Sequence, residues 1–138
     1  MRDVSSFRRE LAQFRYSLQL CDSPQARSDS LLRRQLLASA IRAFELTFEL
    51  AVRLLRRHLE ETEPAGVEQL PFDDLVRLGA ERGLIDSPVD WFGFREKRYS
   101  TADRYVEGKA EQIYATLPAF VARAVYLLAA LERLNSRT

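Results

Sequence analysis

Histidine and cysteine each occur only once in this 138-residue chain, as His58 and Cys21. A single cysteine cannot form an intrachain disulfide, and it cannot build a cysteine-rich metal site. A single histidine excludes a zinc site made of histidines and argues against a Ser-His-Asp triad. The glycine motifs GxGxxG and GxxxxGK[ST] are also missing. We therefore expect no metal and no cofactor.

The chain also lacks a long apolar run and a surplus of charge of one sign. No apolar stretch follows the first six residues as it would in a secretory signal, and none approaches the ~18 apolar residues of a membrane span. The 21 basic and 20 acidic residues leave a net charge of +1, too little to draw the protein to nucleic acid or a membrane. We expect a cytoplasmic protein in which any anion site is a local cluster.

What the chain does have is enough apolar residues for a core. They make up 46% of the sequence, and 30% of the residues are charged, which is typical of a folded globular protein. The length is that of one domain, so we expect residues 1–138 to form a single domain.

Apolar residues recur every three or four positions along most of the chain, which is the spacing of amphipathic helices. No segment alternates as a strand does. The pattern predicts an all-α fold, an up-and-down four-helix bundle with an additional short helix. The expected helices are Val4 to Leu18, Asp29 to Glu60, Phe72 to Arg82, Pro88 to about Tyr99, and Val106 to Leu134.

Pro118 falls inside the last expected helix, where the apolar pattern continues in phase on both sides, so we expect a kink and not an end.

The helix from Asp29 carries a second apolar stripe, formed by Leu46, Leu50 and Leu54. Together with the broad apolar face from Tyr114 to Leu131, this stripe predicts a homodimer.

Two glutamates interrupt the apolar pattern of the longest helix. Glu45 and Glu49 lie one turn apart, and Arg42 and Arg53 are spaced to pair with them. One interpretation is a solvated row of ion pairs. The other is that Glu45 or Glu49 holds a partner from elsewhere in the chain, such as Arg98, because a carboxylate near a bundle interior needs a compensating cation.

A polar cluster follows the aromatic stretch that begins at Trp91. It is either a solvated loop or a site at the end of a helix. Its cations could bind an anion such as a nucleotide. The residues that we single out are the cations Arg95, Lys97, Arg98 and Arg104, with Thr101, Asp103 and Tyr105 beside them.

Three segments together resemble the nucleotidyltransferase substrate-binding proteins, a family of HEPN-like all-α domains. They are Ala40 to Ala51, Gly83-Leu84-Ile85 followed by Trp91, and Arg98 to Tyr105, which falls where the family has Arg-Asn-x-Thr-Ser-His-x-Tyr. The resemblance extends from Asp29 to about Phe120.

The resemblance implies a homodimer and a partner, a minimal nucleotidyltransferase. Several such pairs are toxin–antitoxin systems. In those pairs the HEPN subunit is a metal-independent ribonuclease, and the nucleotidyltransferase silences it by adenylylating the motif tyrosine. By position, Arg98, Thr101 and Tyr105 match the motif, and Tyr105 would be the modified residue. Its alternative role is packing at the start of the last helix.

The motif departs from the family at two positions, with Tyr99 for asparagine and Asp103 for histidine. Histidine can accept or donate a proton near neutral pH, whereas an unperturbed aspartate is ionised and has no proton to donate to a leaving group. We expect Arg98 to be held by carboxylates, with Asp103 the first candidate and Glu45 or Glu49 the second. Two hypotheses follow: a non-catalytic subunit that docks a nucleotidyltransferase, or a ribonuclease with a variant site acting on RNA.

Overall fold

The computed structural model describes residues 3–100 and 108–135, and for residues 99 and 100 it describes the backbone alone. Every regular element in these ranges is helical, which confirms the all-α prediction. The elements are α1 Ser5–Cys21, α2 Pro24–Ser28, α3 Ser30–Thr62, the 3-10 helix η1 Val67–Gln69, α4 Phe72–Glu81, α5 Pro88–Ser100, α6 Lys109–Tyr114 and α7 Leu117–Asn135.

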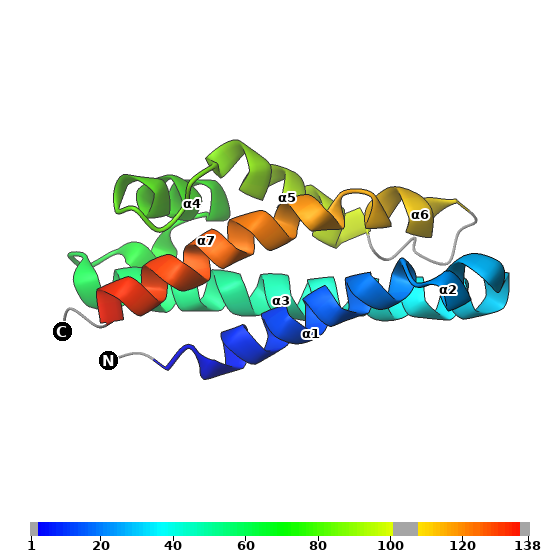
Figure 1. Ribbon diagram of the computed structural model, residues 1–138. Helices are drawn as coiled ribbons and strands as arrows, with labels where there is room; N and C mark the ends of the chain where they lie inside the picture. Colours follow the sequence, from blue (N-terminus) through cyan, green and yellow to red (C-terminus); the bar gives the residue numbers. More distant parts are fainter. Residues whose placement is uncertain (1–2, 101–107, 136–138) are drawn as a thin grey trace.

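Helix α3 is the spine of the molecule and contacts all the other helices. Figure 1 shows α1 and α7 lying along α3, with the α4–α5 pair beyond α7 and the short helices α2 and α6 at the opposite end from the chain termini. The start of α3 follows from its sequence, because Asp29 accepts hydrogen bonds from the backbone N–H groups of Leu31 and Leu32, both at 3.1 Å.

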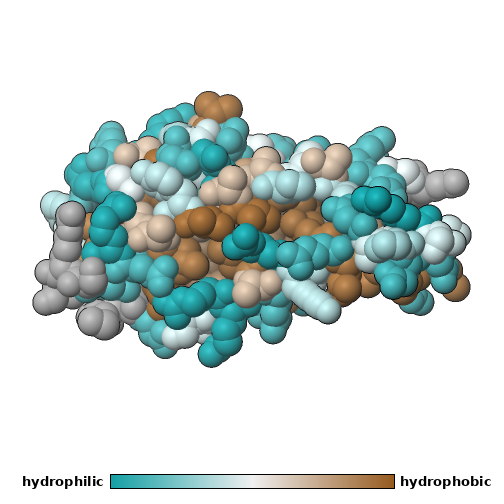
Figure 2. Space-filling model, in the orientation of Figure 1, coloured by the Kyte–Doolittle hydropathy of each residue, from teal (hydrophilic) through white to brown (hydrophobic). Residues whose placement is uncertain are grey.

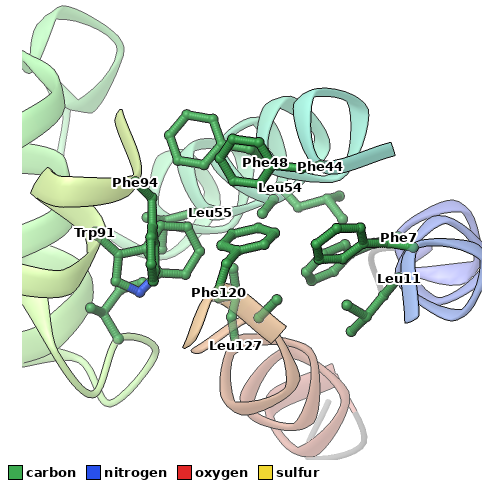
Figure 3. Packing of buried hydrophobic residues seen from close by; sticks show 14 of the residues in the cluster. Phe7, Leu11, Phe44, Phe48, Leu54, Leu55, Trp91, Phe94, Phe120 and Leu127 are labelled. Atoms are coloured by element: carbon green, nitrogen blue, oxygen red, sulfur yellow. The ribbon is translucent and has the colours of Figure 1, made fainter. Parts of the chain in front are cut away.

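The core is a cluster of aromatic rings gathered around Phe120 of α7 (Figure 3). The Phe120 ring meets Phe44 of α3 and Phe94 of α5 nearly edge-on, with both centroid distances 5.1 Å. Trp91 of α5 packs on the same ring at 5.8 Å. Each such pair adds roughly 0.5–1.5 kcal/mol beyond its area burial. These contacts set the orientation of α5 on α3, and so position the last turn of α5.

Pro118 ends a helix, contrary to the kink that we expected. Helix α6 stops at Tyr114 and α7 begins at Leu117. The reason is local, because proline has no N–H to donate to the carbonyl four residues earlier, that of Tyr114, and its ring crowds that carbonyl. The turn is closed by the Thr116 N–H and hydroxyl, which both donate to the Ile113 carbonyl, at 3.0 and 2.7 Å.

The second apolar stripe of α3 is also less regular than expected. Leu54 is buried in the core, Leu50 is half-buried, and only Leu46 is clearly exposed. A short helix, α2, occupies residues where we expected none, and Ser23 caps it by accepting from the Ala26 N–H at 3.3 Å. Its five residues are too few for an apolar period to be visible in the sequence.

One stretch is apolar enough to cross a membrane by length and composition, which we did not expect. It is Lys109–Asn135, which spans α6 and α7, and a third of its most apolar window is buried inside the bundle. The core helix of a soluble protein meets the same criterion, and here Leu117, Phe120 and Leu127 pack into the core. A cytoplasmic location stays a prediction.

Candidate functional site

The side chain of Arg98 lies against two glutamates of α3. Its Nη1 donates to Glu45 Oε2 at 3.3 Å, and its Nη2 donates to Glu49 Oε1 in a short hydrogen bond. Each terminal nitrogen therefore faces a different carboxylate. The contact joins the end of α5 to the middle of α3, across 53 positions of sequence for Glu45 and 49 for Glu49.

Core packing brings these groups together. Glu45 and Glu49 are one turn apart and each follows a core phenylalanine, Phe44 or Phe48, so both carboxylates emerge beside the aromatic cluster. Arg98 lies one turn after Phe94 on α5, and Phe94 packs against Phe120. The aromatic contacts shown in Figure 3 therefore place the last turn of α5 next to the part of α3 that carries the two glutamates.

The two carboxylates have very different environments. The Glu45 side chain is 6% exposed and the Glu49 side chain is 46% exposed, while Arg98 between them is 30% exposed. Arg42 lies one turn before Glu45, with its Nη1 3.8 Å from Glu45 Oε1. The four side chains form a row of alternating charge whose formal sum is zero, and Arg98 offsets the cost of burying Glu45.

The cations predicted from the sequence do not all lie in one cluster. Arg95 pairs with Asp73 of α4 at 3.7 Å, and its guanidinium lies over the Phe72 ring at 5.1 Å, so it joins α4 to α5. Lys97 is half-buried on α5. Within the described ranges Glu49 pairs with Arg98 and forms no ion pair with Arg53.

The other residues of the motif, Thr101, Asp103, Arg104 and Tyr105, lie outside the described residues. Their roles therefore stay predictions, as does a contact between Arg98 and Asp103. Within residues 3–100 and 108–135 there is no group of three or more His, Cys, Asp or Glu side chains that could hold a metal ion.

A second arginine cluster was missed by sequence reasoning. Arg33 of α3 donates from Nε and Nη2 to the two oxygens of Glu111 of α6, at 2.8 and 2.9 Å, and from Nη1 to the Cys21 carbonyl at 2.5 Å. Its guanidinium lies 5.4 Å from the centre of the Tyr114 ring, and the Tyr114 hydroxyl donates to Asp22 Oδ1 at 2.8 Å. No local pattern links Arg33 to Glu111, 78 positions away.

These contacts shift the pKa values of Glu111 and Tyr114. The hydrogen bonds from Arg33 hold the pKa of Glu111 below its usual value, because they favour the ionised carboxylate. Burial, followed by the hydrogen bond to Asp22, raises the pKa of the Tyr114 phenol above its usual value. The cluster ties α6 to the end of α1 and the start of α3, immediately after residues 101–107.

A comparison with protein families bears on the resemblance noted above. The family described as nucleotidyltransferase substrate binding protein like matches residues 2–133, nearly the whole chain. The chain belongs to this family. The match confirms the resemblance and extends it from the expected Asp29–Phe120 region to residues 2–133.

The chain is also similar to a curated protein and to a solved structure. The chain is 30% identical over 110 residues to a protein of Haemophilus influenzae described as probable ribonuclease HepT, covering 77% of this chain and 74% of that one. It also resembles the solved structure of HI0074 from Haemophilus influenzae, described as the fold of a substrate binding domain of a nucleotidyltransferase. The TM-score is 0.88 at 22% identity, over 94% of this chain and 99% of the other. At that identity, the likeness establishes the fold.

Proposed function

We propose that this protein is a non-catalytic substrate-binding subunit that forms a homodimer and docks a minimal nucleotidyltransferase, as in toxin–antitoxin pairs. Family membership over residues 2–133 carries the link to a nucleotidyltransferase. The partner is a protein, and the subunit itself needs neither metal nor cofactor. The other parts of the proposal rest on the motif and on the surface of α7.

The charge arrangement supports the absence of catalysis. Arg98 is shared between Glu45 and Glu49. Where the family motif has histidine, this chain has Asp103. Cleavage of RNA by its own 2′-hydroxyl requires a base and also an acid for the leaving oxygen. The residues available supply carboxylates and a guanidinium, without an imidazole.

The surface of α7 supports the homodimer. Figure 2 shows apolar atoms gathered along the middle of the face on which α7 lies in Figure 1. Val125 and Tyr126 are 39% and 40% exposed, and the charged residues of α7 are confined to Arg123, Glu132 and Arg133. An apolar helix face of this kind is typical of an interface. Its exposed residues are Ala119, Ala122, Val125, Tyr126 and Ala129.

The oligomer is tested by placing a charge on this face. Val125→Asp is expected to convert a dimer into a monomer, as measured by light scattering at micromolar concentration. Val89→Asp is the matched control, because Val89 of α5 is 75% exposed and lies outside the face. A wild-type chain that scatters as a monomer of about 16 kDa, the mass of one 15.9 kDa chain, would contradict the homodimer.

Docking is tested with the cognate minimal nucleotidyltransferase that the proposal requires. We expect a stable complex in size-exclusion chromatography from purified components. Incubation with ATP and magnesium, followed by peptide mapping, then asks whether Tyr105 gains a nucleotidyl group, as the family motif implies. Modification at Tyr105 would show that the partner also regulates this subunit, whereas a stable complex with unmodified Tyr105 would make docking the function. Failure to form a complex would contradict the proposal.

The second candidate function is a metal-independent ribonuclease. It is favoured by the 30% identity to the protein described as a probable ribonuclease. We expect the unmodified chain to cleave little or no RNA in the presence of a chelator, and its expression alone to leave growth unchanged. Asp103→His restores the motif histidine and is the informative variant. Cleavage by the unmodified chain that Arg98→Ala abolishes would favour this candidate over the first.

A further inference from the structure

The two partners of Arg98 differ in how easily they could leave it. The Glu45 carboxylate lies inside the bundle, with a side chain only 6% exposed, so separating it from Arg98 would leave a charge in a poorly solvated place. The Glu49 side chain is 46% exposed and water can solvate its carboxylate as soon as it moves away. Exposed ion pairs of this kind contribute only about 0–1 kcal/mol.

The position of Glu49 is one that a phosphate group would take. A guanidinium binds phosphate oxygens through the same N–H groups that it offers to a carboxylate. Arg98 directs Nη2 at the half-exposed Glu49 and Nη1 at the buried Glu45. An anion that approaches Nη2 therefore competes with Glu49, which is already bonded there.

We propose that Glu49 is an internal competitor for a phosphate group at Arg98, and that Glu45 is a positioning residue that keeps the guanidinium in place during the exchange. This inference goes beyond the proposed function, which does not require an anion to bind at the Arg98 cluster. In this proposal, the charge of Glu49 controls how readily a phosphate group binds at Arg98.

The competition also selects among phosphates. A phosphodiester carries one negative charge, as Glu49 does, and Glu49 has the advantage of being attached to the same chain at high effective concentration. A terminal phosphate or a polyphosphate carries two or more charges, so it interacts more strongly with the guanidinium at the same separation. The ligand class that the cluster favours is thus a polyphosphate, such as the triphosphate of a nucleotide, over an RNA backbone.

The test is a calorimetric titration of the full-length chain with inorganic tripolyphosphate. Glu49→Gln removes the competing charge and is expected to tighten binding about tenfold. Glu60→Gln is the matched control, because Glu60 is exposed on the same helix and the change in net charge is identical. Its expected gain is under about twofold at physiological salt. In the double variant Arg98→Ala with Glu49→Gln, the tenfold gain should disappear.

Three results would overturn the proposal: equal gains in Glu49→Gln and Glu60→Gln, a gain that survives loss of Arg98, or no binding of tripolyphosphate by wild type and Glu49→Gln alike. A second set of titrations uses ATP without magnesium and a 2′-O-methyl RNA tetramer with no terminal phosphate. The ATP affinity should follow that of tripolyphosphate. Tighter binding of the tetramer than of ATP would show that the ligand is a phosphodiester and would refute the selectivity.

The positioning role of Glu45 has its own readout, the nitrogen-15 resonances of the Arg98 guanidinium, assigned by their loss in Arg98→Ala. They should stay sharp in Glu49→Gln and broaden in Glu45→Gln, because Glu45 restrains the group. The reverse pattern would overturn the assignment of the two roles. These measurements use the chain alone, so their failure leaves dimer formation and docking intact. A failure of docking would likewise leave the phosphate result standing.

Discussion

Arg33 and Arg98 both join α3 to a helix far along the chain, but they do so in different ways. Arg33 grips both oxygens of one carboxylate, Glu111, and also a backbone carbonyl. Arg98 divides its two terminal nitrogens between two carboxylates, one buried and one exposed. The Arg33 arrangement fits the planar fork of a guanidinium and fastens α6 to the bundle. The Arg98 arrangement leaves one partner that can be exchanged.

The largest expected effect of breaking either cluster is that of Arg98→Ala. We expect the free energy of unfolding to fall by about 3 kcal/mol, because Glu45 would be left buried with Arg42 3.8 Å away as its remaining described cation. Urea denaturation measures the loss. In a Glu45→Gln background the same substitution should cost about half as much. Equal costs in the two backgrounds would show that the destabilisation has another origin.

Arg33→Ala is expected to cost somewhat less, about 2 kcal/mol, because Glu111 is half in water and can be solvated after the change. Arg33→Lys should recover little of this loss, since an ammonium group cannot reproduce the bonds to both Glu111 oxygens and to the Cys21 carbonyl. Denaturation of the two variants side by side makes the comparison. Full recovery by lysine would mean that charge alone, and not the fork geometry, stabilises this cluster.

Tyr114→Phe removes the hydrogen bond to Asp22 and should cost about 1 kcal/mol at pH 7. It should also change the pH dependence. The pKa of Tyr114 is raised in the folded protein, so the folded state keeps this proton while the unfolded phenol loses it above its ordinary pKa of about 10. Stability from this group is complete below pH 10 and is lost as the pH rises further.

The melting temperature of wild type should therefore fall more steeply than that of Tyr114→Phe between pH 9 and 11. Tyr126→Phe is the control, since this tyrosine is 40% exposed on α7. Parallel curves for wild type and Tyr114→Phe would argue against a buried, bonded phenol at position 114.

The smallest effect is expected for Glu49→Gln, about 0.5 kcal/mol or less, because this carboxylate is nearly half exposed. The difference between this value and the loss from Arg98→Ala would measure how unequally the two glutamates hold the arginine. A loss above about 2 kcal/mol, from urea denaturation, would place Glu49 with Glu45 as a fixed partner and remove the basis for exchange.

Much of the fold could be predicted from local patterns. The helix predicted from Asp29 begins there, with Asp29 as its N-cap, and Gly83 after α4 has the left-handed φ of 81° that suits a C-terminal glycine. Each of these capping signals involves only a few neighbouring residues, so it can be recognised in the sequence without knowledge of the rest of the structure. The break before Pro118 is also local, but the in-phase apolar pattern concealed it.

The sequence also indicated part of the candidate site. Glu45 or Glu49 was expected to hold Arg98 as the second choice after Asp103, and the pairing with both is observed, whereas Asp103 is outside the described residues. Glu45, Glu49 and Arg98 were considered together because they lie in segments that resemble the family's motifs. The cluster of Arg33, Glu111 and Tyr114 carried no such motif, and no periodicity relates Arg33 on α3 to the two residues on α6.

By itself, the sequence determined the helical class, most helix ends and the family, because periodicity, capping and motif spacing are properties of neighbouring residues. Only the tertiary structure decided which charges are buried and which are exposed. Glu45 and Glu49 are the same residue type, one turn apart on one helix. Their side chains are nevertheless 6% and 46% exposed, because burial is set by what packs on a side chain from elsewhere in the chain.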